Sequence, residues 1–305
     1  MCSDQDALSC GSTPKYYSFV KSFGSYGQND GQFDDLYHLT VDQETGYIYV
    51  PDSGNDRIQV FDSTGRFLLK FGSEGDSNGE FDGPRAIGIC YDPKLIFIAD
   101  TSNHRIQVVH ERGEFKFSFG TYGDDNGQFY CPIGVAVDQR NKHVVVSDYN
   151  NKRIQVFDIQ GKFLFNIKLV GKNRDQAWVH PEVTVAIDER NGNIVVADHD
   201  THQIQIYDQK GNFLKQFGSW GSDDGQFNHP RGVSVTTSGL IVVSDNYNHR
   251  VQVFDDQGQF LCKFGSEGSG DGQFRFLKRA CVCPNGYIIV PDSKNDRIQI
   301  FRPHY

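Results

Sequence analysis

Six aspartates, spread evenly along the 305 residues, are the side chains best placed to take part in chemistry. Five of them are followed five residues later by an arginine, and the remaining one by a glutamine. The pairs are Asp52–Arg57, Asp100–Arg105, Asp148–Arg153, Asp198–Gln203, Asp245–Arg250 and Asp292–Arg297. A carboxylate and a guanidinium at this spacing can form a charge-assisted pair. Six equivalent pairs cannot all belong to one active site, so the pattern indicates a structural role in closing a turn.

The aspartates recur every 47 to 50 residues, which defines a repeat. Within one repeat, residues 225–265, four short runs rich in Val, Ile, Phe and Leu are separated by Gly, Asn, Asp and Pro. Such runs predict a four-stranded antiparallel meander, and no segment has the apolar spacing of a helix. Six meanders arranged radially form a six-bladed β-propeller, an all-β fold around a central channel.

The two ends of the sequence complement each other. The sixth unit ends at residues 298–305 without its fourth strand, whereas residues 16–24 carry the pattern of that strand. We therefore expect the N-terminal strand to complete the last blade and close the ring, which removes an exposed sheet edge. Residues 1–14 are expected to be disordered and residues 15–305 to form the propeller.

Composition narrows the possible functions. The formal net charge of −9 disfavours general binding to nucleic acids or acidic membranes. No apolar run is long enough to span a membrane, and the first residues do not resemble a secretory signal. The seven cysteines have no regular spacing and include no CxxC pair. This pattern predicts a reduced, cytoplasmic protein.

Two phrases recur in the repeats, FGSxGxxxGQFxxPxGVxV and IVVSDxxNHRVQVF, clearly at 217–254 and more loosely at 71–109, 119–157 and 264–301. These units resemble NHL repeats, and the chain from about residue 16 onward is most similar to the C-terminal propeller of tripartite-motif (TRIM-NHL) proteins. The resemblance implies an interaction module, which binds single-stranded or hairpin RNA in several relatives and proteins in others. The RING finger, B-boxes and coiled coil of the ubiquitin-ligase relatives have no counterpart here, so we expect no ligase chemistry in this chain.

One face of the predicted propeller has an uneven charge. In each blade, the loop before the first strand and the loop between the second and third strands lie on the same face, here called the upper face. The loops before the first strands carry a formal charge of −8 over blades 1–3 and +1 over blades 4–6. Cations interleaved with aromatic rings suit base stacking or the anchoring of a peptide. The predicted binding residues are Lys172, Arg174, Trp220, Arg231, Tyr247, Arg275, Phe276, Lys278, Arg279 and Lys294.

Two further features concern the upper face. The positions that follow the proline of the NHL pattern are expected to point at the mouth of the channel: Tyr37, Arg85, Ile133, Glu182, Arg231 and Lys278. The fourth repeat departs from the pattern over residues 168–182, where Trp178 replaces the usual Phe. This loop is either a decayed repeat that still packs or a loop available to a partner.

Catalysis is not expected. The predicted first strands carry no Asp, Glu or His. His38, His180 and His229 lie near the mouth and could hold zinc, but they belong to blades 1, 4 and 5 and no acid or base accompanies them. The sequence thus predicts a monomeric, non-catalytic scaffold without cofactor, metal, membrane or small-molecule substrate. It would bind a protein partner through the upper face of blades 4–6. The alternative is sequence-selective RNA binding on the same face.

Overall fold

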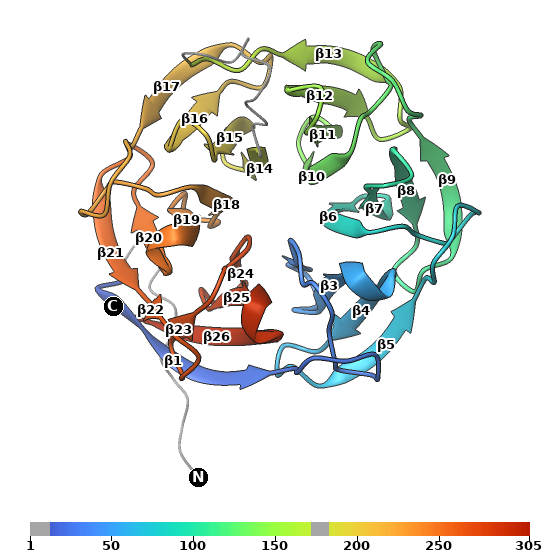
Figure 1. Cartoon of the computed structure of the whole chain (residues 1–305). Helices are drawn as coiled ribbons and strands as arrows, with labels where there is room; N and C mark the ends of the chain where they lie inside the picture. Colours follow the sequence, from blue (N-terminus) through green and yellow to red (C-terminus); the bar gives the residue numbers. More distant parts are fainter. Residues whose placement is uncertain (1–12, 172–182) are drawn as a thin grey trace.

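The predicted strands form six four-stranded antiparallel sheets around a central channel (Figure 1). The computed structural model describes residues 13–171 and 183–305. From the innermost to the outermost strand, the first three blades are β2 (Thr40–Val41), β3 (Ile48–Asp52), β4 (Arg57–Phe61), β5 (Phe67–Phe71); β6 (Pro84–Tyr91), β7 (Lys94–Asp100), β8 (Arg105–Val109), β9 (Phe115–Phe119); and β10 (Pro132–Asp138), β11 (His143–Asp148), β12 (Arg153–Asp158), β13 (Phe163–Ile167). The last three are β14 (Val183–Asp188), β15 (Asn193–Asp198), β16 (Gln203–Tyr207), β17 (Phe213–Phe217); β18 (Pro230–Val235), β19 (Ile241–Asp245), β20 (Arg250–Phe254), β21 (Phe260–Phe264); and β24 (Cys281–Val282), β25 (Ile288–Asp292), β26 (Arg297–His304), β1 (Tyr16–Phe23).

The prediction of an all-β six-bladed propeller is confirmed. Helical structure within residues 13–171 and 183–305 is limited to three short 3₁₀ turns that follow second strands: η1 (Ser53–Asn55), η2 (Asn246–Asn248) and η3 (Ser293–Asn295). A two-stranded parallel ladder, β22 (Ser266–Glu267) with β23 (Gln273–Phe274), shapes the loop before blade 6. None of the helices in the part of the chain that is described could cross a membrane, since each is too short.

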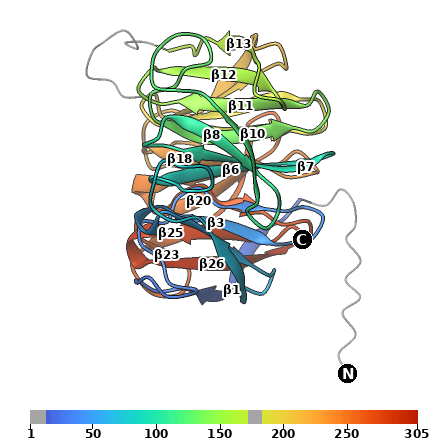
Figure 2. The same ribbon diagram turned by 90° about the vertical axis from the view of Figure 1, so that its right-hand side faces the viewer.

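The ring is closed by its two ends, as the sequence predicted. Strand β1 pairs antiparallel with β26, in a register that runs from Tyr16 opposite His304 to Phe23 opposite Ile298. Figure 2 shows β1 beside β26 at one edge of the disc. The rings of Phe19 and Phe301 pack edge-on at 6.0 Å between centroids. Of the segment expected to be disordered, residues 1–12 lie outside the described residues, whereas Pro14 is buried.

The core lies between neighbouring blades. One cluster joins Ala197 and Ile206 of blade 4 to Phe227, Val243 and Phe254 of blade 5, and all five side chains are buried. Each blade therefore completes the core of the next, which is the arrangement expected when no repeat folds alone. The glycine after the outer strand is part of this packing. Gly218 has a φ of +92°, and a Cβ there would collide with the ring of Phe227.

Candidate binding surface on the upper face

In each of the five blades with an Asp–Arg pair, here called the regular blades, the pair forms a hydrogen-bond network that holds the loops of the upper face. Blade 5 illustrates this network. The carboxylate of Asp245, fully buried at the end of β19, accepts hydrogen bonds from Arg250 Nε at 2.8 Å and from Asn248 Nδ2 at 2.8 Å. The Arg250 guanidinium also donates to the carbonyls of Ser222, Asp223 and Gln226 in the loop before β18.

The same network occurs at the other four Asp–Arg pairs, where the arginine Nε lies 2.7 to 2.9 Å from the aspartate Oδ2. Burial raises the pKa of Asp245 even though hydrogen bonds from Asn228, Asn248 and Arg250 act to lower it. The predicted structural role of the pairs is confirmed, and it is larger than closing a turn, because each pair also fastens the loop before its blade.

A cluster of cations and aromatic rings lies at the upper mouth of the channel. Lys278 Nζ is 3.6 Å from the ring centroid of Tyr37 and 5.2 Å from that of Phe276. The Arg231 guanidinium carbon lies 4.6 Å from the Phe276 centroid, and that of Arg85 lies 4.6 Å from the Tyr37 centroid. These distances fall within the range of cation–π attraction. Four of the six positions expected at the mouth thus come together, and we call Tyr37, Arg85, Arg231, Phe276 and Lys278 the mouth cluster.

His38 is packed against the mouth cluster. It is 1% exposed, and neither ring nitrogen has a hydrogen-bond partner in good geometry among the described residues. Burial lowers the pKa of His38 well below its usual value, and the charges of Lys278, Arg279 and Arg231 lower it further, whereas the backbone of Ile133 acts in the opposite direction. His38 is therefore a neutral imidazole beneath a group of fixed cations.

The predicted binding residues do not form one continuous set. Tyr247 joins the mouth cluster through an edge-on contact with Phe276, at 6.0 Å between centroids. Lys278 requires a correction, since it is only 2% exposed and supports the aromatic rings rather than offering its charge to solvent. Arg275 and Lys294 are both exposed, and the two share a backbone hydrogen bond. Trp220 is 70% exposed on the loop after β17, with no ring contact to the cluster among the described residues. Lys172 and Arg174 lie outside the described residues, as do Trp178, His180 and Glu182.

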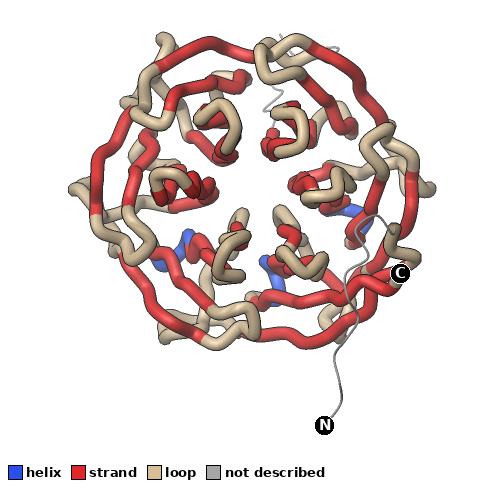
Figure 3. Tube along the Cα trace, turned by 180° about the vertical axis from the view of Figure 1, so that it is seen from behind, coloured by secondary structure: helices blue, strands red, loops and turns tan. Residues whose placement is uncertain are grey.

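The lower part of the channel holds a cavity of about 490 Å³. Its wall consists mainly of apolar first-strand side chains such as Ile87, Val135 and Ile187, and Arg279 contributes a cation. One acid that the sequence analysis did not place there, Glu189, lies just after β14 on the same wall. Figure 3 shows the blades from this side, arranged around the central axis. The cavity is large enough for a small molecule, a class of ligand that the sequence did not suggest.

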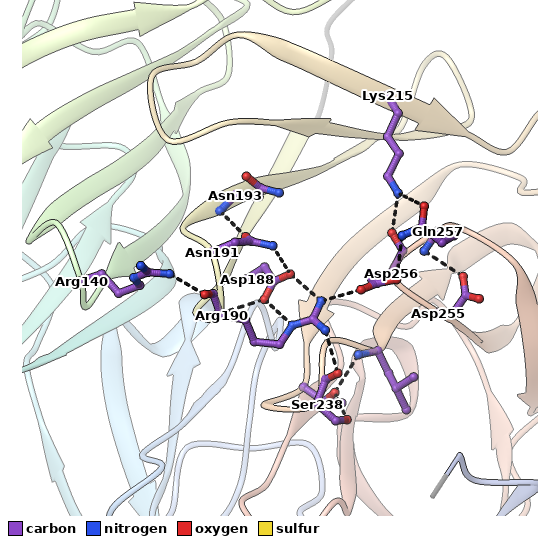
Figure 4. Close-up of polar contacts among 12 residues, drawn as sticks. Arg140, Asp188, Arg190, Asn191, Asn193, Lys215, Ser238, Asp255, Asp256 and Gln257 are labelled. Carbon is purple, nitrogen blue, oxygen red and sulfur yellow. Dashed lines mark hydrogen bonds and ion pairs between the residues drawn. The ribbon is translucent and has the colours of Figure 1, made fainter. Parts of the chain in front are cut away.

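The lower face of blades 3 to 5 is held by an ion-pair network around Arg190 (Figure 4). Arg190 Nη2 contacts Asp188 at 2.8 Å and Asp256 at 3.1 Å, and its Nη1 donates to the carbonyl of Ser238. Desolvation acts to raise the pKa of Asp188, but the hydrogen bonds and charge of Arg190 lower it overall. Because this arginine is paired on every side with neighbouring loops, the network is structural.

Sequence reasoning missed a cluster of chemically active side chains on blade 4. His199 Nδ1 lies 2.7 Å from Asp200 Oδ1 and 3.3 Å from His229 Nδ1, and the ligand atoms of all three residues lie within 4.8 Å of one another. The sequence does mark this cluster. The four residues after the repeat aspartate are HDTH in blade 4, whereas in the other blades they are SGND, TSNH, YNNK, NYNH and SKND. From the sequence alone, His229 groups with His38 and His180 instead, and His180 lies outside the described residues.

Comparison with known proteins agrees with this geometry. Residues 129–157, 183–207 and 227–254 match the NHL repeat family, and together they make up less than half of the chain. No curated protein sequence matches the chain. Among solved structures, a structural-genomics protein of unknown function from Bacteroides thetaiotaomicron VPI-5482 has a TM-score of 0.72 at 14% identity, over 94% of this chain and 76% of the other.

A second solved structure, an auxiliary nutrient binding protein from the same organism, has a TM-score of 0.67 at 13% identity, over 90% of this chain and 70% of the other. At such identities the likeness shows the fold alone. The chain is thus a six-bladed β-propeller that contains NHL repeats. The more specific resemblance to the tripartite-motif proteins stays a prediction.

Proposed function

We propose that this propeller is a non-catalytic, monomeric interaction scaffold that binds a protein partner through the upper face of blades 4–6. The observation that carries the proposal is the accessible part of the mouth cluster on blades 5 and 6, Arg231 and Phe276, together with the exposed Tyr247. Its rings are already held by cations and by each other, so a partner that contacts them orders few additional side chains. Aromatic and arginine side chains of this kind supply most of the binding energy at protein interfaces.

The charge distribution supports an oriented interaction. The upper loops of blades 1–3 carry a formal charge of −8, so an acidic partner is repelled there and directed to the mouth cluster and blades 4–6. All five cysteines in the described part of the chain are free thiols, which suits the cytoplasmic location that we include in the proposal.

Binding of single-stranded or hairpin RNA on the same surface is the second candidate. The specific observation in its favour is the placing of two guanidinium groups on aromatic rings, a combination that also stacks with bases. The two functions differ in their response to salt. RNA affinity falls linearly on a logarithmic scale, with a slope near −0.7 for each phosphate neutralised, whereas an interface anchored by apolar contacts responds less.

The test combines two assays on the intact chain. RNA crosslinking with sequencing and affinity capture with mass spectrometry are performed on the parent and on a Tyr247→Ala, Arg275→Glu double variant. Both substituted side chains are exposed, so the fold should be retained. Lys116→Glu, on the outer strand β9, is the matched charge control. A protein lost only from the double variant supports the proposal. Loss of a specific RNA motif supports the second candidate, and unchanged binding in the double variant contradicts both.

A further inference from the structure

We infer that His199, Asp200 and His229 form a binding site for one divalent transition metal ion, with Zn²⁺ the best match, on the upper face between blades 4 and 5. Two imidazoles and a carboxylate are a ligand set that zinc accepts, and three protein ligands leave a fourth position for water or another ligand. The three residues are partly exposed, so an ion can reach them from solvent.

The distances fit such an ion. Two nitrogen ligands about 2.05 Å from a tetrahedral zinc lie about 3.3 Å apart. The Nδ1 atoms of His199 and His229 are separated by 3.3 Å. Asp200 Oδ1 is 2.7 Å from His199 Nδ1, so the carboxylate must move outward by about 0.6 Å to reach the spacing of about 3.3 Å expected between ligands of a tetrahedral ion.

Three possible ligand atoms converge in this cluster. An imidazole nitrogen has one in-plane position, which holds either a proton or a lone pair. His199 Nδ1 faces two groups, Asp200 Oδ1 and His229 Nδ1. Without an ion, a single Nδ1 proton must be shared between the two, and the 3.3 Å contact with His229 is long for a hydrogen bond. A metal ion instead binds one lone pair from each of the three groups.

A second oxygen of the same cluster points to the same conclusion. Asp200 Oδ2 is buried and has no hydrogen-bond partner within the residues described. A buried carboxylate oxygen without a partner is costly and calls for a compensating group such as an ion. His202 is different, because its Nδ1 accepts a hydrogen bond from the backbone of His229, just as His104 Nδ1 accepts one from Cys131 in the neighbouring repeat. We therefore assign His202 to the scaffold.

The repeats supply matched variants for the test. The residue equivalent to His199 is Ser53 in blade 1, whose hydroxyl donates to the carbonyl of Pro84 in the next blade. His199→Ser restores this repeat residue opposite Pro230 and should fold. His229 has a φ of +54°, and its equivalent in blade 2 is Gly83, with a φ of +60°, so His229→Gly suits the backbone as well. His104→Ala removes a histidine of the scaffold type and is the control.

The experiment titrates the full-length protein with Co²⁺, followed by its visible absorption, and with Zn²⁺ by calorimetry. We expect one ion per chain and the visible absorption bands of a low-symmetry cobalt site with nitrogen ligands. His199→Ser and His229→Gly should each weaken binding at least about tenfold, whereas His104→Ala should not. Absence of binding in the parent overturns the inference, as does undiminished binding in both site variants. The readout involves no partner, so its result is independent of the proposed scaffold function.

Discussion

Blades 4 and 5 are built from the same repeat, yet they hold their upper loops differently. In blade 5, Gln252 Nε2 donates to the carbonyl of Gln226 and its Oε1 accepts from the amide of Gly225, while Arg250 binds the same loop. In blade 4 the arginine position is Gln203, and among the described residues its amide makes a 3.4 Å contact with the carbonyl of Gly218.

In blade 4, a tyrosine forms some of the hydrogen bonds that hold the loop before the first strand. Tyr207 replaces the phenylalanine of the repeat, and its hydroxyl accepts from the amide of Val170 at 3.0 Å and donates to Gln205. Gln205 Nε2 in turn donates to the carbonyl of Val170. The histidines of the candidate metal site occur in this same blade and beside it. The comparison shows that Tyr207 and Gln205 hold the described end of the loop in blade 4, and that this blade carries histidine at position 199, where the other blades carry Ser, Thr, Tyr or Asn.

Opening the ring should have the largest effect, because both kinds of blade depend on closure. A variant that lacks residues 1–23 loses all of β1 and exposes the edge of β26. We expect it to lose cooperative unfolding or to melt far below the parent in calorimetry. A variant that lacks only residues 1–12 is the control. A truncated chain that melts like the parent would show that closure by β1 contributes nothing.

The buried aspartates test the comparison directly. Asp245→Ala leaves the buried guanidinium of Arg250 without its carboxylate and should cost about 3–5 kcal/mol of unfolding free energy. Asp198→Ala, in blade 4, should cost less, about 1–3 kcal/mol, because position 203 supplies no guanidinium. Urea denaturation of both variants measures the difference. Equal losses would mean that blade 4 relies on its aspartate as much as a regular blade does.

The sequence predicted what the repeat encodes. Strand number, the Asp–Arg pairs and closure by β1 all follow from period and pattern, which six copies make readable. The site was harder, because it depends on distances between blades. Nothing in the sequence shows that the amine of Lys278 packs over Tyr37 from blade 1, or that His229 turns toward His199. Such contacts join residues that are remote in the chain, and a local pattern does not encode the angle at which neighbouring blades meet.

The buried aspartates of the regular blades are fully hydrogen-bonded, whereas the buried ring of His38 is not. The stability of the protein should therefore depend on pH through His38. Burial holds the pKa of His38 in the folded state well below the 6.5 of a free imidazole, so the unfolded chain binds the proton more tightly. The group therefore destabilises the fold as pH falls below about 6.5, by up to about 2 kcal/mol at pH 5. Between pH 7 and pH 5, His38→Gln should lose less stability than the parent in parallel denaturation curves. If the two proteins lose the same amount, the imidazole is not held neutral.

The last two variants exchange a single hydroxyl group between blades 4 and 5, and so test whether Tyr207 accounts for the difference between these blades. Tyr207→Phe removes the hydroxyl that binds Val170 and Gln205, and should cost about 1 kcal/mol. Phe254→Tyr places a hydroxyl in the apolar packing of Phe217 and Phe227, where Gln252 is already engaged, and should cost about 1–3 kcal/mol. Urea denaturation resolves both changes. A neutral Phe254→Tyr would show that a regular blade accepts the tyrosine, and blade 4 would then differ from blade 5 in its histidines and Gln203 rather than in how its core holds the loop.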